Sequence, residues 1–111
     1  MHFHVTSTTN RDSVLKHGLD WSQMGEARGI AGSRRPEVSG VFLCRDESEA
    51  DWFVYLNNTG GPVDVWQVDG VPDSDLAPSP NGYAYLPRAI PTGQLTLVHR
   101  GLPPGHRLAR P

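Results

Sequence analysis

The chain has 111 residues and a mass of 12.2 kDa, which is room for one compact domain. Ten Lys and Arg against twelve Asp and Glu give a formal net charge of -2, which disfavours a protein that coats duplex nucleic acid with uniform positive charge. The single cysteine, Cys44, excludes an intrachain disulfide and a thiolate-rich zinc site, and it predicts a cytoplasmic location. No apolar run approaches the roughly 20 residues that span a bilayer, so we expect no membrane partner.

The first residues predict a short strand followed by a short helix. Phe3 and Val5 alternate with polar residues, and this period of two places His4 and Thr6 on one face of the strand. A two-turn helix over 10–17 follows, with hydroxyl or amide side chains just before it as candidate N-caps and a glycine after it as its end.

Residues 19–39 are the longest stretch without a periodic pattern. Glycines and serines there surround Arg28, Arg34 and Arg35. A loop of this length is uncommon unless it serves a ligand or is disordered. Guanidinium groups and exposed backbone amides bind phosphate oxygens, so anion binding is one interpretation. A solvated arginine pair in a mobile loop is the other.

The rest of the chain predicts one further helix and four further strands. Asp46 followed by Glu49 resembles a capping box, and apolar residues at helical spacing continue to Leu56, so we expect a helix there. A turn-rich connection is expected over 72–81. Short apolar or alternating runs predict strands over 41–44, 63–68, 83–86 and 95–98.

This order of elements predicts an α+β fold in which two small helices pack against a mostly antiparallel sheet. We expect a single domain over 1–100 and a Pro-rich, basic tail over 101–111. No Asp or Glu follows Asp75, whereas four arginines do, so the C-terminal third is cationic.

Motifs of several common enzyme classes are absent from the sequence. There is no phosphate-binding Walker loop, no dinucleotide-binding glycine motif, no His-Glu-x-x-His helix and no nucleophile elbow. His2 and His4 have the spacing to chelate a metal from one strand face, but no third ligand is evident, so we predict no metal site. Cys44 lies in an apolar run, which favours packing over a role as nucleophile.

Three motifs in order resemble those of the ADP-ribosyltransferase superfamily. The first is Phe-His-Val-Thr-Ser at 3–7, followed by His-Gly-Leu at 17–19. The second is Gly-Val-Phe-Leu at 40–43. The third is Ser-Pro-Asn-Gly-Tyr-Ala-Tyr-Leu at 79–86, followed by Ile90 and a proline, which is similar to the RNA 2'-phosphotransferase branch. Together the motifs cover residues 3–98.

The resemblance implies a small split, mostly antiparallel sheet whose cleft holds NAD as a substrate. In such families the motif histidine contacts a ribose of NAD, the backbone of the next residue pairs with the nicotinamide carboxamide, and an aromatic ring stacks on the nicotinamide. Carried over to this chain, the resemblance assigns catalysis to His4, Phe42 and Tyr83. It assigns NAD binding to His4, Val5, Thr6, Ser7, Arg34, Phe42, Ser79 and Asn81.

This chain departs from the family in two respects. The catalytic glutamate of many members has no counterpart after Asp75. The phosphotransferase branch has a histidine where Phe42 stands, together with an RNA-binding lobe that this chain lacks. We therefore disfavour tRNA repair and expect transfer of ADP-ribose to an unknown acceptor, namely a phosphate, a nucleobase or a protein side chain. The alternatives are a non-catalytic module that binds NAD, ADP-ribose or a nucleotide, and a small interaction protein with a basic C-terminal segment.

Overall fold

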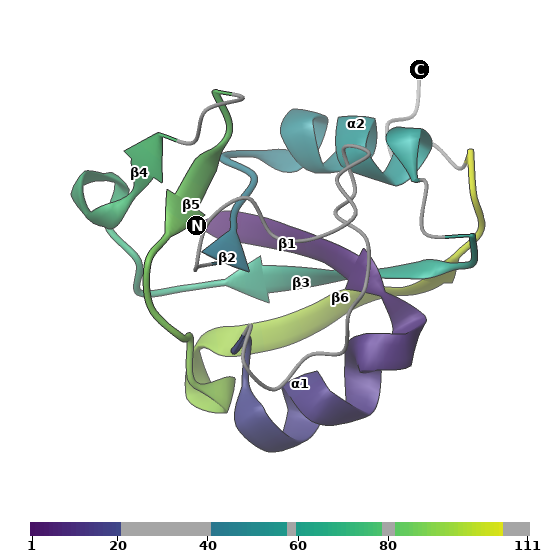
Figure 1. The fold of residues 1–111 in the computed structure, drawn as a ribbon, viewed down its shortest axis with the longest axis horizontal. Coiled ribbons are helices and arrows are strands. Elements are labelled where there is room, and N and C mark those ends of the chain that lie inside the picture. The colour runs from purple at the N-terminus through teal and green to yellow at the C-terminus, as the bar shows by residue number, and fades with distance from the viewer. Residues whose placement is uncertain (21–40, 58–59, 79–81, 106–111) are drawn as a thin grey trace.

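The fold is described from a computed structural model, which describes residues 1–20, 41–57, 60–78 and 82–105 (Figure 1). Within these residues there are two α-helices, six strands and three short 3-10 helices. In chain order they are β1 (His2–Ser7), η1 (Thr8–Asn10), α1 (Arg11–His17), β2 (Val41–Phe42), α2 (Glu47–Leu56), β3 (Val63–Val68), η2 (Asp73–Asp75), β4 (Ala77–Pro78), β5 (Ala84–Leu86), η3 (Thr92–Gln94) and β6 (Leu95–Leu102).

The strands form two antiparallel sheets, with the orders β1-β3-β6 and β2-β5-β4. The sheets meet at Phe3 and Cys44. The amide of Phe3 donates to the carbonyl of Cys44 at 2.9 Å, and the amide of Cys44 donates back at 2.6 Å. The α+β class, with a small split antiparallel sheet and two short helices, is therefore confirmed.

Both faces of the first sheet are covered. In Figure 1, α2 lies along one side of the sheet and α1 along the other. One apolar cluster lies on the side of α2 and comprises Phe3, Val5, Cys44, Ala50, Val54, Val63 and Val65. The second lies on the side of α1 and the second sheet and comprises Val14, Leu19, Val41, Leu43, Trp66, Val68, Val71, Leu86 and Ile90. Because successive strand residues point to opposite faces, β3 contributes to both clusters.

The helix ends follow the sequence signals in part. Asp46 is the N-cap of α2, as predicted, and its Oδ1 accepts from the amide of Glu49 at 2.9 Å. Asn10 occupies the N-cap position of α1, but its side chain makes no capping bond. Ser7 instead caps the 3-10 helix η1, since its hydroxyl accepts from the amide of Thr9 at 3.2 Å.

Several boundaries differ from the sequence prediction. Leu19 was expected to begin a loop, but it is fully buried and forms a bridge with Ile90. The short strand β4 was not predicted, because a two-residue strand carries no period. The last strand continues to Leu102, so the first two residues of the expected tail belong to the sheet. Among the described helices, none has both the length and the apolar character needed to cross a membrane.

Candidate functional site

His4 lies where β1 approaches β2. Its Nδ1 is 2.7 Å from the backbone carbonyl oxygen of Phe42. A carbonyl oxygen only accepts hydrogen bonds, so Nδ1 carries the proton and Nε2 carries a lone pair. Burial lowers the pKa of His4 and outweighs the opposing effect of the bond to Phe42. The ring is therefore neutral at neutral pH, with a lone pair on Nε2.

The Nε2 atom of His4 is buried and has no hydrogen-bond partner within the described residues. Leaving a buried acceptor unpaired costs about 1–3 kcal/mol, so such an atom calls for a physical explanation. A ligand that donates a hydrogen to this atom is one such explanation.

The backbone of Val5 lies on the same edge of β1. Phe3 exchanges both of its backbone hydrogen bonds with Cys44, and backbone groups two residues apart in a strand point to the same edge. The N–H and C=O of Val5 therefore face the side of β2, and no bridge from this edge to another described residue extends beyond Phe3. A donor and an acceptor lie side by side there.

Two aromatic rings from the expected site have different surroundings. Phe42 is half-buried, and its ring centroid is 6.0 Å from that of Tyr85, its cross-strand partner. Tyr83 packs edge-on against Phe53 of α2, with ring centroids 4.8 Å apart. The structure thus brings His4 and Phe42 together and places the ring of Tyr83 against α2. Tyr85, which the sequence did not assign to the site, stands beside Phe42.

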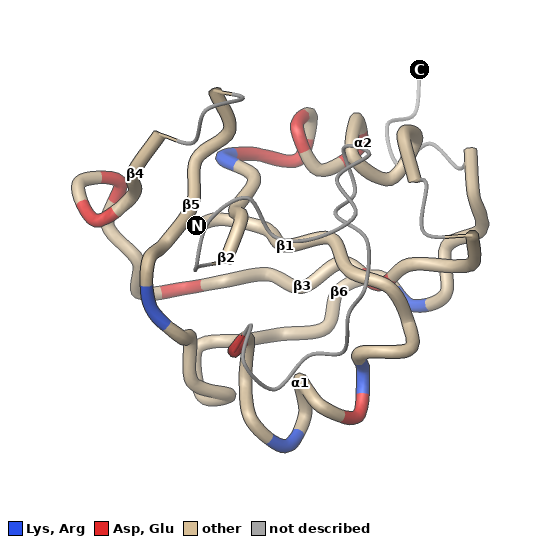
Figure 2. Tube along the Cα trace, viewed as in Figure 1, with Lys and Arg blue, Asp and Glu red and all other residues tan. Residues whose placement is uncertain are grey.

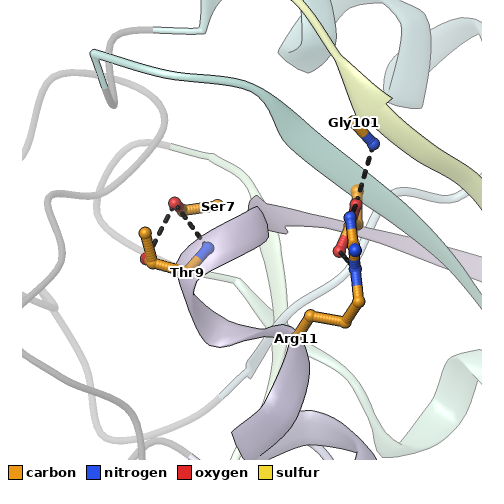
Figure 3. Close-up of polar contacts among 5 residues, drawn as sticks. Ser7, Thr9, Arg11 and Gly101 are labelled. Carbon is orange, nitrogen blue, oxygen red and sulfur yellow. Dashed lines mark hydrogen bonds and ion pairs between the residues drawn. The ribbon is translucent and has the colours of Figure 1, made fainter.

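The side chains of Thr6 and Ser7 form hydrogen bonds within the fold. The hydroxyl oxygen of Thr6 accepts from the side-chain amide of Asn10 at 2.9 Å, in a buried contact. The hydroxyl of Ser7 accepts from the amide of Thr9 and also contacts the Thr9 hydroxyl at 2.9 Å (Figure 3). Both side chains therefore hold the turn from β1 into α1.

Asp64 of β3 is fully buried and makes three hydrogen bonds. The Nε and Nη2 atoms of Arg11 donate to its two oxygens at 2.8 Å each, and the amide of Gly101 donates at 2.9 Å. Burial alone would raise the pKa of Asp64, but the bonds from Arg11 and Gly101 outweigh it and lower the pKa. Both oxygens are occupied, so Asp64 ties α1 to β3 and β6 and is not placed to act as a base.

Two further buried nitrogen atoms lack partners within the described residues, Nδ1 of His2 and Nε1 of Trp66. The other ring nitrogen of His2, Nε2, lies 2.7 Å from Oδ1 of Asp73. His2, His4 and Trp66 share one face of the first sheet, since His2 is two residues from His4 and Trp66 is the cross-strand partner of His4. In the sequence, the spacing of His2 to His4 indicated a pair of metal ligands at most. The sequence did not predict that Nδ1 of His2 is buried without a partner among the described residues.

Five residues expected to bind NAD or its phosphates lie outside the described residues: Arg28, Arg34, Arg35, Ser79 and Asn81. Figure 2 shows β1 and β2 without Lys, Arg, Asp or Glu, so the junction at His4 and Phe42 is built from uncharged residues. A flat aromatic ring suits such surroundings better than a phosphate.

Cys44 is a buried member of the cluster beneath α2. Burial raises the pKa of its thiol, which disfavours the nucleophilic thiolate, and the predicted packing role is confirmed. In the part of the chain that the structure describes, no group of three or more His, Cys, Asp or Glu is arranged to hold a metal ion.

Comparison with known proteins found no match among protein-family models, curated proteins or solved structures.

Proposed function

We propose that the protein binds NAD where β1 meets β2 and transfers its ADP-ribose group to an acceptor, as the resemblance to the ADP-ribosyltransferase superfamily implies. The observation that carries the proposal is the His4 ring, which is neutral, fixed by the carbonyl of Phe42, and left with an unpaired lone pair at Nε2.

We assign a counterpart at this junction to a ribose hydroxyl and to the nicotinamide group of NAD. The lone pair of His4 accepts a hydrogen bond from a ribose hydroxyl. The N–H and C=O of Val5 pair with the nicotinamide carboxamide, which offers an acceptor and a donor. The half-buried ring of Phe42 stacks on the nicotinamide. Arg34, Ser79 and Asn81 belong to the proposal through the resemblance, with the arginine on the diphosphate.

The reaction transfers one bond at the ribose. The acceptor forms a bond to the ribose carbon as the carbon–nitrogen bond to nicotinamide breaks, and the electron pair of that bond returns to the pyridine nitrogen, so nicotinamide leaves neutral. Asp64 has both oxygens engaged, and no carboxylate follows Asp75. An acceptor that brings its own negative charge, such as a phosphate, is therefore favoured over one that needs a strong base.

The engagement of Asp64 and the lack of Asp or Glu after Asp75 also favour a second candidate, a module that binds NAD or ADP-ribose without turnover. Neither β1 nor β2 carries a carboxylate, the group that stabilises the positively charged ribose in many transferases. The two candidates share the binding contacts and differ only in nicotinamide release.

The test is calorimetric titration of NAD into the purified protein, with nicotinamide release measured in the same mixture. We compare wild type with His4→Ala and, as a matched control, with His17→Ala, since His17 is an exposed residue of α1. Binding that His4→Ala abolishes and His17→Ala retains supports the site, and release of nicotinamide selects the transferase. An unchanged affinity in His4→Ala would remove this site from NAD binding.

A further inference from the structure

A second lone pair lies on the same face as that of His4. The Nε2 atom of His2 is 2.7 Å from Oδ1 of Asp73. In the neutral ring, Nε2 carries the proton and donates a hydrogen bond to this carboxylate. The remaining lone pair then lies on Nδ1, which is buried and has no partner among the described residues. His2 and His4 thus present two hydrogen-bond acceptors from alternate positions of one strand.

A hydrogen-bond donor accompanies the two acceptors. Trp66 is the cross-strand partner of His4, and its indole N–H is also buried without a partner among the described residues. Cross-strand partners hold their side chains next to each other. An N–H donor and the surrounding apolar cluster disfavour the binding of a cation. Two acceptors and one donor therefore fit an uncharged polar group of a ligand.

Resting on the proposed function, we propose that His2 and His4 bind the two neighbouring hydroxyls of one ribose of NAD, so that His2 selects a ribose whose vicinal diol is unmodified. A diol supplies two O–H donors for the two lone pairs, and its oxygens accept from Trp66.

Asp73 acts as a positioning residue for His2. Its side chain is 90% exposed, whereas that of His2 is 4% exposed, so the carboxylate reaches from the surface and fixes which ring nitrogen carries the proton. His4 and Phe42, unlike His2, are partly exposed.

The experiment measures the affinity of wild type for NAD and three analogues at mildly alkaline pH. Two analogues lack the 2'-hydroxyl of the nicotinamide-side or the adenosine-side ribose, and the third is NADP, in which the adenosine-side hydroxyl carries a phosphate. We expect one deoxy analogue to bind about tenfold more weakly than NAD, because a buried acceptor loses its donor. If the two histidines bind the adenosine-side ribose, the affinity for NADP is lowered as well. The comparison of the three analogues therefore identifies which ribose is bound.

The variant His2→Phe keeps a ring of similar size and removes the lone pair. With the 2'-hydroxyl held by His2 and its neighbour by His4, we expect this variant to bind NAD about tenfold more weakly and to bind NAD and the discriminated deoxy analogue equally, because the contact that distinguishes them is gone. His17→Phe is the matched control and retains the discrimination of wild type. Asp73→Ala should also reduce the discrimination, because the carboxylate that holds Nε2 of His2 is gone.

The outcomes separate the two proposals. If wild type binds NAD but binds both deoxy analogues within twofold of it, the diol inference is overturned and the NAD function stands. If wild type does not bind NAD, the proposed function fails and the inference fails with it. Should His2→Phe not fold, nitrogen-15 spectra of the wild-type imidazoles decide, since NAD must move the Nδ1 resonance of His2, and an unmoved resonance rejects the inference.

Discussion

At the scale of single residues, the fold depends on a few buried polar groups whose partners come from distant parts of the chain. Asp64 is the clearest case, because it receives hydrogen bonds from Arg11 of α1 and from Gly101 of β6. Neither partner is a neighbour of Asp64 in the sequence, and nothing in the alternation of β3 marks this position as buried.

We expect Asp64→Ala to lower the free energy of unfolding by about 3 kcal/mol, as loss of one partner from a buried pair does. Arg11 is partly exposed and can turn to solvent, which keeps the loss at the lower end of the range for such pairs. Chemical denaturation measures the effect. The matched control is Asp75→Ala, which breaks an exposed ion pair with Arg88 and should cost no more than about 1 kcal/mol.

The same pair gives a pH dependence. The pKa of Asp64 is lowered in the folded state, so its stabilisation is complete above the ordinary Asp value of about 3.9 and is lost as the pH falls through the folded-state pKa. The difference in stability between wild type and Asp64→Ala should therefore narrow in acid. A constant difference down to strongly acidic pH would contradict the assignment.

His4 is a base whereas Asp64 is an acid, but it too should make the protein less stable as the pH falls. Burial lowers its pKa, so the unfolded chain binds a proton more readily than the folded chain does. The contribution of His4 to the free energy of unfolding should be constant above about pH 6.5, the ordinary pKa of His. It should fall as the pH drops below that value towards the folded-state pKa. We expect His4→Gln to show a smaller loss between neutral pH and about pH 5. Denaturation series at each pH measure this, and His17→Gln tests whether loss of any histidine flattens the curve.

At the scale of elements, short signals decide where helices begin and end. The Asp46 cap and the end of α1 at Gly18 were predicted from local residue types, because capping and chain reversal depend on neighbours in the sequence. The bridge between Leu19 and Ile90 was not, because it joins segments 71 positions apart and depends on the packed core.

Gly18 tests how tightly this end of α1 is packed. Its φ is 78°, and a Cβ atom there would overlap the carbonyl oxygen of Ile90. We expect Gly18→Ala to destabilise the protein by more than the roughly 1 kcal/mol that an unfavourable φ alone costs, because the Leu19–Ile90 bridge must shift. Thermal unfolding measures the loss. Gly93→Ala, at a position with open space and no positive φ, should leave the melting temperature nearly unchanged.

At the scale of the whole molecule, one sheet separates two apolar clusters, and β3 contributes to both. Because the clusters share a strand, we expect them to unfold together. Leu43→Ala on one side should cost about 2–5 kcal/mol and Phe3→Ala on the other about 3–5 kcal/mol.

Both variants should still show a single transition when far-ultraviolet and near-ultraviolet circular dichroism are compared. Separate transitions for the two signals would mean that the clusters are independent. Leu15→Ala, at a residue 59% exposed, is the control and should stay within about 0.5 kcal/mol of wild type.

The sequence by itself determined the class of fold, both helices, and the strands that carry a clear pattern, since these follow from local periodicity and capping. It also proposed that His4 and Phe42 belong to one site, and the bond between them shows that the two residues do meet. Only the tertiary structure decided that Tyr83 packs on α2, that both oxygens of Asp64 are engaged, and that Nδ1 of His2 is buried without a partner among the described residues. These depend on partners far along the chain, and which partner satisfies a buried polar atom is set by the packed fold rather than by the residues around it.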